Sequence, residues 1–576
     1  MTTAQESQST IVGYADELVW EPPGPGMWER SPSKQPKPIT GFFRAMVRNL
    51  NDVFGEIGPR YGLLIDGFQM ADVNGWLYLR PKPVGAPDRA GPPPPRFVMR
   101  MLLLLHPGLR ARRRSAERAL ATRLWLRDGR EWLDGGRDAF VARVGEVTAE
   151  DPRRLSREEL RIHITGLVDL LGEGLRIHWR DFLGHALSVG DFARQASGWT
   201  GVSPDEVVTV LAGFSPFSIA PLDHLDRIVE VLEAAPEMRQ RFLDQALPAE
   251  DRLAAFRSSS PEASAAVDEY LFEYGHRGFS GFFDVDAMSI AEMPDVLVAS
   301  IAARLNRPVV THPETTDWVR PRVPDEHRHE YDALKAEAEV LYGLRDSDVG
   351  PAAEWPLGLV RRALLVAGEL LATDGALLRP DHIFDAVSEE IDALLRRDSQ
   401  APSPDELAER HHRRLTAPAD PPVILGDVEH PPSFDWLPGA LGRINNAIML
   451  GMSFDGGLGA DAEPRSPAST MELTGIAASR GAYRGQARVV TTPADFGRLV
   501  QGDVLVAVTT TPAYNVLLPL LGAVVTDTGG VLSHAAIVAR EYHIPAVVAT
   551  GTATTSIPDG SLVTVDGDRG IVIIEG

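Results

Sequence analysis

The sequence predicts a multidomain protein in which a large, mainly helical region precedes a small C-terminal domain rich in strands. Between residue 41 and about residue 392, apolar residues recur at helical spacing among abundant Ala, Leu, Arg and Glu, which is typical of amphipathic helices. Beyond residue 470 the sequence changes to short β-branched runs bounded by Gly, Pro and Asp, which is typical of strands. A chain of 576 residues is long enough for about three or four domains.

Composition divides the chain into four segments. Residues 1–40 are rich in Pro, Gly, Ser and Gln and are expected to form an irregular N-terminal arm, although Trp20 and Trp28 indicate that it is held against an apolar surface. Residues 41–450 form the helical domain. Residues 451–470 contain almost no large apolar side chains and are expected to form a flexible linker. Residues 471–576 form the strand-rich domain.

The elements follow from local patterns. Helices are expected over segments whose apolar residues repeat every three or four positions: 159–171, 207–211, 225–234, 261–274 and 357–373. Strands are expected over short β-branched runs: 472–478, 486–491, 504–508, 523–526, 546–549, 562–566 and 570–574.

Charge and composition exclude several classes of function. The 57 Lys and Arg residues and 80 Asp and Glu residues give a net charge of −23, which nucleic-acid phosphates would repel. The chain has 0 cysteines, which excludes disulfides and cysteine-ligated metals and fits a reducing compartment. The N-terminus lacks a signal pattern, and the longest apolar runs fall short of the ~20 residues of a membrane helix. We therefore expect a cytoplasmic protein that binds neither nucleic acid nor membranes.

Residues 526–550 carry the clearest chemical signal. A strand leads into the turn Gly529–Gly530, and a helix is predicted to begin near Ser533, whose hydroxyl suits an N-cap. His534 therefore lies in the first turn of a helix, where unpaired backbone N–H groups and the helix dipole favour an anion. Because a neutral imidazole is a competent nucleophile, the sequence predicts a histidine that carries a phosphoryl group.

The neighbours of His534 suggest how phosphate would be held. Thr528 and Ser533 can donate hydrogen bonds to phosphoryl oxygens, beside the backbone of Gly529–Gly530, and Arg540 can pair with phosphate or with an acidic group. The alternative is that a lone histidine at a helix start is structural or exposed. The Gly-Gly turn, the Ser-His step and the Ala-rich helix favour the functional interpretation.

The segment from Thr526 to Val548 resembles the phosphohistidine signature of the mobile domain of phosphoenolpyruvate-utilising enzymes, the family of phosphoenolpyruvate synthase, pyruvate phosphate dikinase and rifampicin phosphotransferase. The residues that match the signature are Gly529, Gly530, Ser533, His534, Ala535, Ala536, Ala539, Arg540, Ile544, Pro545, Ala546 and Val547. Residues 475–481, 485–488 and 502–505 also match this domain. The resemblance implies that His534 is phosphorylated and that residues 471–576 form a swivelling β/β/α phosphohistidine domain.

The helical region resembles the substrate-binding domain of rifampicin phosphotransferase and the matching region of phenylphosphate synthase. The similarity covers Tyr274–Gly278 and Leu344–Arg345, and continues over residues 357–371 and 375–390. In rifampicin phosphotransferase a lysine follows the arginine after four residues, whereas Val349 stands at that position here.

This second resemblance implies catalytic roles for three side chains. His276 could take the proton of an acceptor hydroxyl, while Arg277 and Arg345 could neutralise the transferring phosphoryl group. The alternatives are that His276 and Arg277 only cap a helix end, and that Arg345 forms a surface ion pair with Asp346 or Asp348.

Enzymes of this family phosphorylate the histidine with ATP in an ATP-grasp domain, or exchange the phosphoryl group of that histidine with phosphoenolpyruvate in a barrel domain. Residues 1–450 show neither a phosphate-binding loop of the P-loop type nor an ATP-grasp pattern, and no barrel is expected beyond Gly576. The resemblance therefore implies a two-component enzyme like phenylphosphate synthase and the 4-cresol-phosphorylating (4-methylbenzyl phosphate synthase) systems. A separate ATP-grasp subunit would use ATP and Mg²⁺ to phosphorylate His534.

The implied acceptor is the hydroxyl of a small, phenolic or aromatic substrate, as in the degradation of aromatic compounds. Two alternatives stay open: a component that phosphorylates a rifamycin-type antibiotic, and a non-catalytic phosphohistidine carrier or regulator. His327 and His329 lack the spacing of a metalloprotease motif, and we predict no metal site on this chain.

Overall fold

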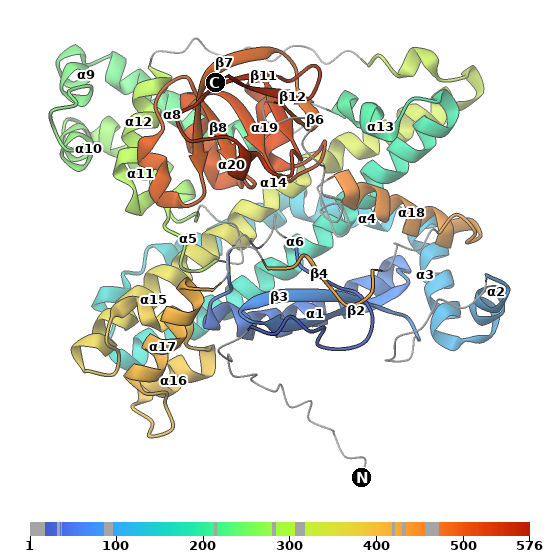
Figure 1. The fold of residues 1–576 in the computed structure, drawn as a ribbon, viewed down its shortest axis with the longest axis horizontal. Coiled ribbons are helices and arrows are strands. Elements are labelled where there is room, and N and C mark those ends of the chain that lie inside the picture. Colours follow the sequence, from blue (N-terminus) through green and yellow to red (C-terminus); the bar gives the residue numbers. More distant parts are fainter. Residues whose placement is uncertain are drawn as a thin grey trace.

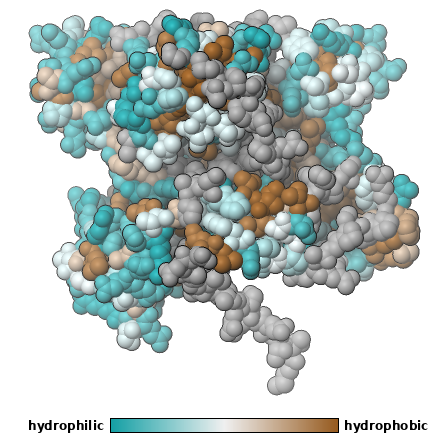
Figure 2. All heavy atoms as spheres, viewed as in Figure 1, coloured by the Kyte–Doolittle hydropathy of each residue, from teal (hydrophilic) through white to brown (hydrophobic). Residues whose placement is uncertain are grey.

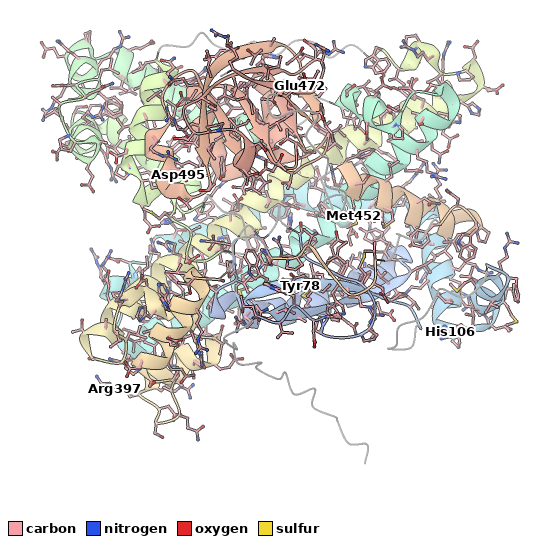
Figure 3. All side chains as sticks on the ribbon, in the orientation of Figure 1. Tyr78, His106, Arg397, Met452, Glu472 and Asp495 are labelled. Carbon is pink, nitrogen blue, oxygen red and sulfur yellow. The ribbon has the colours of Figure 1, made fainter. Side chains whose placement is uncertain are left out.

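The computed structural model describes residues 18–575 except 32–34, 36, 86–95, 212–215, 279–283, 306–316, 418–420, 429–433 and 455–471. Within these residues, helices dominate up to Phe454 and strands dominate from Glu472 onward (Figure 1). The predicted fold class is therefore confirmed. Figure 3 labels Met452, near the end of the last long helix, and Glu472, where the C-terminal domain begins.

The helical region is built from the following elements. The α-helices are α1 (Gly41–Tyr61), α2 (Arg96–Leu105), α3 (Pro107–Thr122), α4 (Leu124–Glu131), α5 (Arg137–Thr148), α6 (Arg157–Thr200), α7 (Pro204–Val207), α8 (Pro216–Glu233), α9 (Pro236–Phe242), α10 (Ala249–Arg257), α11 (Pro261–Tyr274), α12 (Pro294–Arg304), α13 (Arg328–Tyr342), α14 (Leu344–Asp348), α15 (Trp355–Thr373), α16 (Ser388–Arg396), α17 (Pro404–Leu415) and α18 (Gly439–Phe454). A kink at η1 (Trp132–Gly136), the π-helical segment η7 (Val349–Glu354) and the 3₁₀ segment η8 (Pro380–Asp385) interrupt them.

Helix α6 is the axis of this region and spans 44 residues. It begins at a capping box in which the Ser156 hydroxyl and the Glu159 carboxylate satisfy each other's backbone N–H groups. Helix α18 packs closely along it, because a Cβ at Gly190 would lie only 1.9 Å from the Ala447 carbonyl oxygen. Around this pair, side chains from α1, α4, α15 and α16 form the largest buried core.

A small sheet covers one side of the helical region. Its strand order is β2-β3-β1-β4, with β1 (Trp28–Glu29), β2 (Ile65–Val73), β3 (Trp76–Pro83) and β4 (Ile424–Leu425). The N-terminal arm is therefore not irregular throughout, because Trp28 packs with Trp76, Tyr78 and Leu425. The hairpin of β2 and β3 was not predicted, although Asn74 and Gly75 both have positive φ in its two-residue turn.

The C-terminal domain is one curled sheet with short helices. Its strand order is β5-β12-β11-β7-β8-β9-β10-β6, and β7 to β10 run parallel. The strands are β5 (Glu472–Thr474), β6 (Ile476–Ser479), β7 (Ala482–Val490), β8 (Asp503–Ala507), β9 (Leu521–Thr526), β10 (Ala546–Val548), β11 (Leu562–Asp566) and β12 (Ile571–Glu575). The 3₁₀ segment η10 (Pro512–Leu520) and the helices α19 (His534–Glu541) and α20 (Ala553–Ser556) connect them. The predicted strand 472–478 is split at Gly475, so that its halves lie at opposite ends of the strand order.

The C-terminal domain is docked on the helical region. Side chains of α8, α11 and α12 share one buried core with the sheet and with α19. Figure 1 shows these three helices beside the sheet. The loop before α19 rests on the end of α18, where the Leu532 N–H donates to the Phe454 carbonyl at 2.9 Å. Phe454 is buried with Val531 and Ile537, and therefore α18 continues four residues into the predicted linker. The rest of that linker, residues 455–471, lies outside the described residues.

Helix α2 carries a marked apolar surface. Four large side chains of α2 are exposed, and Figure 2 shows apolar atoms gathered where this helix lies: Phe97, Met101, Leu104 and Leu105. Among the described helices, none combines the length and the apolar composition needed to cross a bilayer.

Replacing Gly530 by Ala is expected to push the C-terminal domain off α18, because the new Cβ would lie 2.1 Å from the Phe454 carbonyl oxygen. Small-angle X-ray scattering should then show a larger radius of gyration. Gly497→Ala in the same domain is the matched control, since no described atom lies within 4 Å of its Cβ position. An unchanged scattering profile for a folded Gly530→Ala chain would contradict the described docking.

Candidate active site

His534 is the first residue of α19, as the sequence predicts. Strand β9 leads into the Gly529–Gly530 turn, where Gly529 adopts a φ of 118° that favours glycine. Ser533 is the N-cap, and its hydroxyl accepts a hydrogen bond from the Ala536 N–H. The remaining backbone N–H groups of the first helical turn lie beside the imidazole, which suits an anion carried on the ring.

Both ring nitrogens of His534 are hydrogen-bonded within the C-terminal domain. Nδ1 lies 2.9 Å from the Thr510 hydroxyl, and Nε2 lies 3.0 Å from the Asn515 side-chain oxygen. Because that oxygen only accepts, Nε2 carries the proton and Nδ1 accepts from Thr510. The ring is 5% exposed. A nitrogen must therefore give up its partner before it can bond to phosphorus.

Sequence reasoning missed Thr510 and Asn515. They lie on the segment that joins β8 to β9, with Asn515 inside η10. The sequence signal for these two residues is the run of threonines before Pro512. Pro512 is the first residue of η10, which lies in the same domain as His534.

The predicted phosphate-binding residues divide into two groups. Gly529, Gly530 and Ser533 surround the start of α19, next to His534. Thr528 instead donates its hydroxyl proton to the Val508 carbonyl at 2.8 Å, so in this arrangement the proton is used within the domain and not for a phosphoryl oxygen.

Arg540 also holds the loop rather than facing the ring. Its Nη1 donates to the Val531 carbonyl at 2.6 Å. Burial lowers the pKa of Arg540, while a hydrogen bond with Tyr342 of α13 raises it. Arg540 therefore ties the histidine loop to the helical region.

The structure brings Arg277 close to the segment of Arg345. The Arg277 guanidinium lies 4.5 Å from the centre of the Tyr274 ring and fills the space above Gly350, where a Cβ would lie 2.6 Å from Nη1. Gly350 belongs to η7, which directly follows α14, the helix of Arg345. The side chain of Arg345 lies outside the described side chains.

His276 is less suited to its predicted role as a base. Its backbone carbonyl packs against Gly358 of α15. Burial, and then the charge of Arg362, lower the pKa of His276 to about 4. A base with so low a pKa is poorly matched to removing a proton at neutral pH.

A buried polar cluster beside α14 offers a better base. His178 of α6 and Asp348 of α14 are both buried, with Nδ1 and Oδ1 2.9 Å apart. Asp181, one turn further along α6, is 1% exposed, and burial and the nearby charge of Asp348 raise its pKa to about 7. Strongly shifted carboxyl pKa values are common at functional sites.

The π-helical segment η7 and the kink at η1 flank this cluster. η7 follows Asp348 directly, and Trp132 of η1 donates its indole N–H to the Ser347 hydroxyl at 3.0 Å. Short π-helical insertions occur frequently at functional sites. Sequence analysis did not select His178, because a histidine on a long helix is more often a packing group. The signal was the recurrence of polar residues at positions 178, 181 and 185 on an otherwise apolar face.

The docked histidine domain lies next to this cluster. Tyr342, which contacts Arg540, is the last residue of α13, and α14 begins two residues later. Tyr342 is buried in the same core as Val531, Leu532 and Ile537. The segment that carries Arg345 and Asp348 therefore starts where α19 meets the helical region.

Comparison with known families agrees with the division of the chain into a helical region and a C-terminal domain that carries His534. Residues 499–570 match the mobile domain of PEP-utilising enzymes, and residues 189–365 match the fourth domain of rifampicin phosphotransferase. The first match contains His534 and the second contains Arg277, Arg345 and Asp348. The resemblance seen in the sequence is thereby confirmed: the chain carries a phosphoenolpyruvate-utilising mobile domain beside a domain of the rifampicin phosphotransferase type.

Individual proteins show the same likeness. An uncharacterised phosphotransferase of Bacillus subtilis is 47% identical over 102 residues, covering 18% of this chain and 12% of that protein. Phosphoenolpyruvate synthase of Aeropyrum pernix is 45% identical over 111 residues, covering 19% and 14%. An uncharacterised protein of Mycobacterium tuberculosis is 32% identical over 326 residues, covering 56% and 32%. The chain thus spans less than a third of the length of each relative.

Among solved structures, an NMR structure of Enzyme I matches at 19% identity with a TM-score of 0.15. The match covers 37% of this chain and 65% of that one.

Replacing Thr510 by Val should destabilise the protein, because it leaves the buried Nδ1 of His534 without a donor. The expected loss in the free energy of unfolding is about 1–3 kcal/mol. Thr511→Val is the matched control, since its buried hydroxyl has no hydrogen-bond partner among the described residues. Urea unfolding of both variants measures the difference, and equal stabilities would contradict the assigned hydrogen bond.

Proposed function

We propose that this chain is the phosphohistidine subunit of a two-component phosphotransferase. In this proposal a separate ATP-grasp subunit phosphorylates His534 with ATP and Mg²⁺ in the cytoplasm. The chain then passes the phosphoryl group to the hydroxyl of a small, phenolic or aromatic acceptor. The observation that carries the proposal is the position of His534 at the start of α19, in a mobile domain docked beside α14.

Loading of the histidine requires the two regions to separate. In the docked arrangement the ring is buried, the preceding loop rests on α18, and η10 packs against α8 and α12. After separation, an unprotonated imidazole nitrogen gives up its hydrogen-bond partner and attacks a phosphorus atom of the ATP held by the partner subunit. The bond from that phosphorus to the leaving phosphate oxygen of ATP breaks as the bond to nitrogen forms. The N–H groups of the first turn of α19, with Ser533 and the Gly529–Gly530 backbone, then stabilise the phosphoryl oxygens.

Delivery uses the docked arrangement. The acceptor oxygen bonds to phosphorus as the bond from phosphorus to the His534 nitrogen breaks. His178 takes the hydroxyl proton, and Asp348 orients its imidazole and stabilises the charge that forms. Arg277, and Arg345 by resemblance, neutralise the transferring group. Trp179 and Phe182, whose rings lie 5.6 and 6.2 Å from that of His178, supply aromatic surface for the acceptor.

Two other functions have specific support. The match of residues 189–365 to a rifampicin phosphotransferase domain favours a rifamycin-type acceptor. The burial of His178, Asp181 and Asp348 favours a non-catalytic phosphohistidine carrier, because a packed cluster leaves little room for a substrate. An assay of phosphate transfer separates the three functions. Transfer to simple phenols supports the proposed function, transfer to a rifamycin supports the second, and transfer to no acceptor supports the non-catalytic carrier.

His534→Ala should abolish phosphorylation of the chain, because it removes the imidazole at the start of α19 that accepts the phosphoryl group in this proposal. Incubation with radiolabelled ATP, Mg²⁺ and the ATP-grasp partner should label the unsubstituted chain with acid-labile phosphate. His543→Asn, an exposed histidine just beyond α19, is the control and should label normally. Labelling that survives His534→Ala would refute the proposal.

His178→Ala should leave phosphorylation of His534 intact and slow transfer to the acceptor by ~10²-fold or more, since it removes the base. Asp348→Asn should also slow transfer to the acceptor and leave phosphorylation of His534 intact. His163→Ala is the matched control, because His163 lies on the same helix but pairs with Glu150. Single-turnover transfer from the phosphorylated chain gives the rates, and a normal rate in His178→Ala would exclude this residue as the base.

A further inference from the structure

A second cluster of chemically active side chains lies in the lobe formed by α15, α16 and α17, away from the C-terminal domain (Figure 1). Asp381 and His382 are adjacent in η8, and His411 projects from α17. One ligand atom of each residue lies within 4.8 Å of the other two. Such convergence of two imidazoles and a carboxylate is the arrangement of a metal site.

His382 supplies an independent observation. Its side chain is 5% exposed, and its Nδ1 is buried without a hydrogen bond to any described residue. An unpaired buried nitrogen is costly, and native proteins rarely leave one without a reason. A bound cation would give this nitrogen a partner.

His411 is already oriented as a ligand. Its Nδ1 lies 2.8 Å from Asp385 Oδ2, which leaves Nε2 as the acceptor nitrogen. Nε2 lies 3.7 Å from Asp381 Oδ2, too far for a hydrogen bond. Arg414 fixes Asp385 through bonds of 2.7 and 3.1 Å. A carboxylate behind a metal-binding histidine is a common supporting arrangement.

Nearby cations do not block the cluster. Arg379 donates to both oxygens of Asp381, at 3.0 and 2.7 Å, but its side chain is 66% exposed and can turn into solvent at little cost. Arg361 is held by Glu292 at 2.9 Å. The cluster borders a pocket of about 520 Å³, also lined by His412, which leaves room for a further ligand.

We propose that Asp381, His382 and His411 bind a divalent transition metal, with Zn²⁺ as the favoured ion and a fourth coordination position open to the pocket. Imidazole ligands favour zinc, cobalt, nickel or copper over Mg²⁺ and Ca²⁺, which prefer oxygen. Three protein ligands with one open position are typical of zinc sites that accept water or a substrate. The metal would also tie η8 to α17.

The test uses the full-length chain, stripped with a chelator and then dialysed against Zn²⁺ alone or Co²⁺ alone. We expect one bound ion per chain and, with Co²⁺, the visible absorption of a tetrahedral site. The absence of cysteine removes thiolates as competing ligands. His411→Ala and Asp381→Asn should each weaken binding by more than ~10-fold, and Asp385→Asn by about 10-fold.

His329→Ala, an exposed histidine on α13, is the control and should bind normally. Asp381 is partly exposed, so Asp381→Asn tests the site even if a histidine variant does not fold. Failure to bind one equivalent of either ion would overturn the proposal. So would stoichiometric binding that His411→Ala and Asp381→Asn leave unchanged.

Discussion

The contact between the histidine loop and the end of α18 determines what the rest of the molecule can do. The Leu532 N–H bonds the Phe454 carbonyl, and Gly530 leaves no space for a side chain at the same point. Arg540 and Tyr342 make a second tie across the interface. These contacts hold the loop before His534 and the helix α19 against the helical region. In the proposed function, this docked arrangement is the one that delivers the phosphoryl group, and loading takes place after the domain has separated. The proposed function therefore requires the domain to alternate between this position and a separated one.

Several energetically costly features of the helical region lie together beside α14. Burying His178, Asp181 and Asp348 costs free energy that apolar residues of the same size would not, and the π-helical segment η7 and the kink at η1 interrupt the regular helices there. Arg277 lies against the same segment at Gly350. The cluster around His382 and His411 is a separate case, because it lies in the α15–α17 lobe and shares none of these residues.

Local signals predicted much of the architecture, and long-range contacts account for most of what they missed. The Gly529–Gly530 turn, the Ser533 cap and most of the short strands are encoded by neighbouring residues and agree with the predictions, whereas the predicted strand 472–478 is split into β5 and β6. By contrast, Thr510 and Asn515 lie 24 and 19 positions from His534, and Asp348 lies 170 positions from His178. The end of α18 was also missed, because tertiary packing of Phe454 extends a helix into a segment whose composition favours a linker.

Alternation between a docked and a separated domain is the central claim, and an interdomain distance measurement tests it most directly. Because the chain has 0 cysteines, two introduced cysteines, at Gly497 and on the exposed face of α16, can carry spin labels without further changes. The account predicts a single docked distance for the chain alone, and a second, longer distance when the ATP-grasp partner and ATP are present. One unchanged distance while His534 becomes phosphorylated would contradict it.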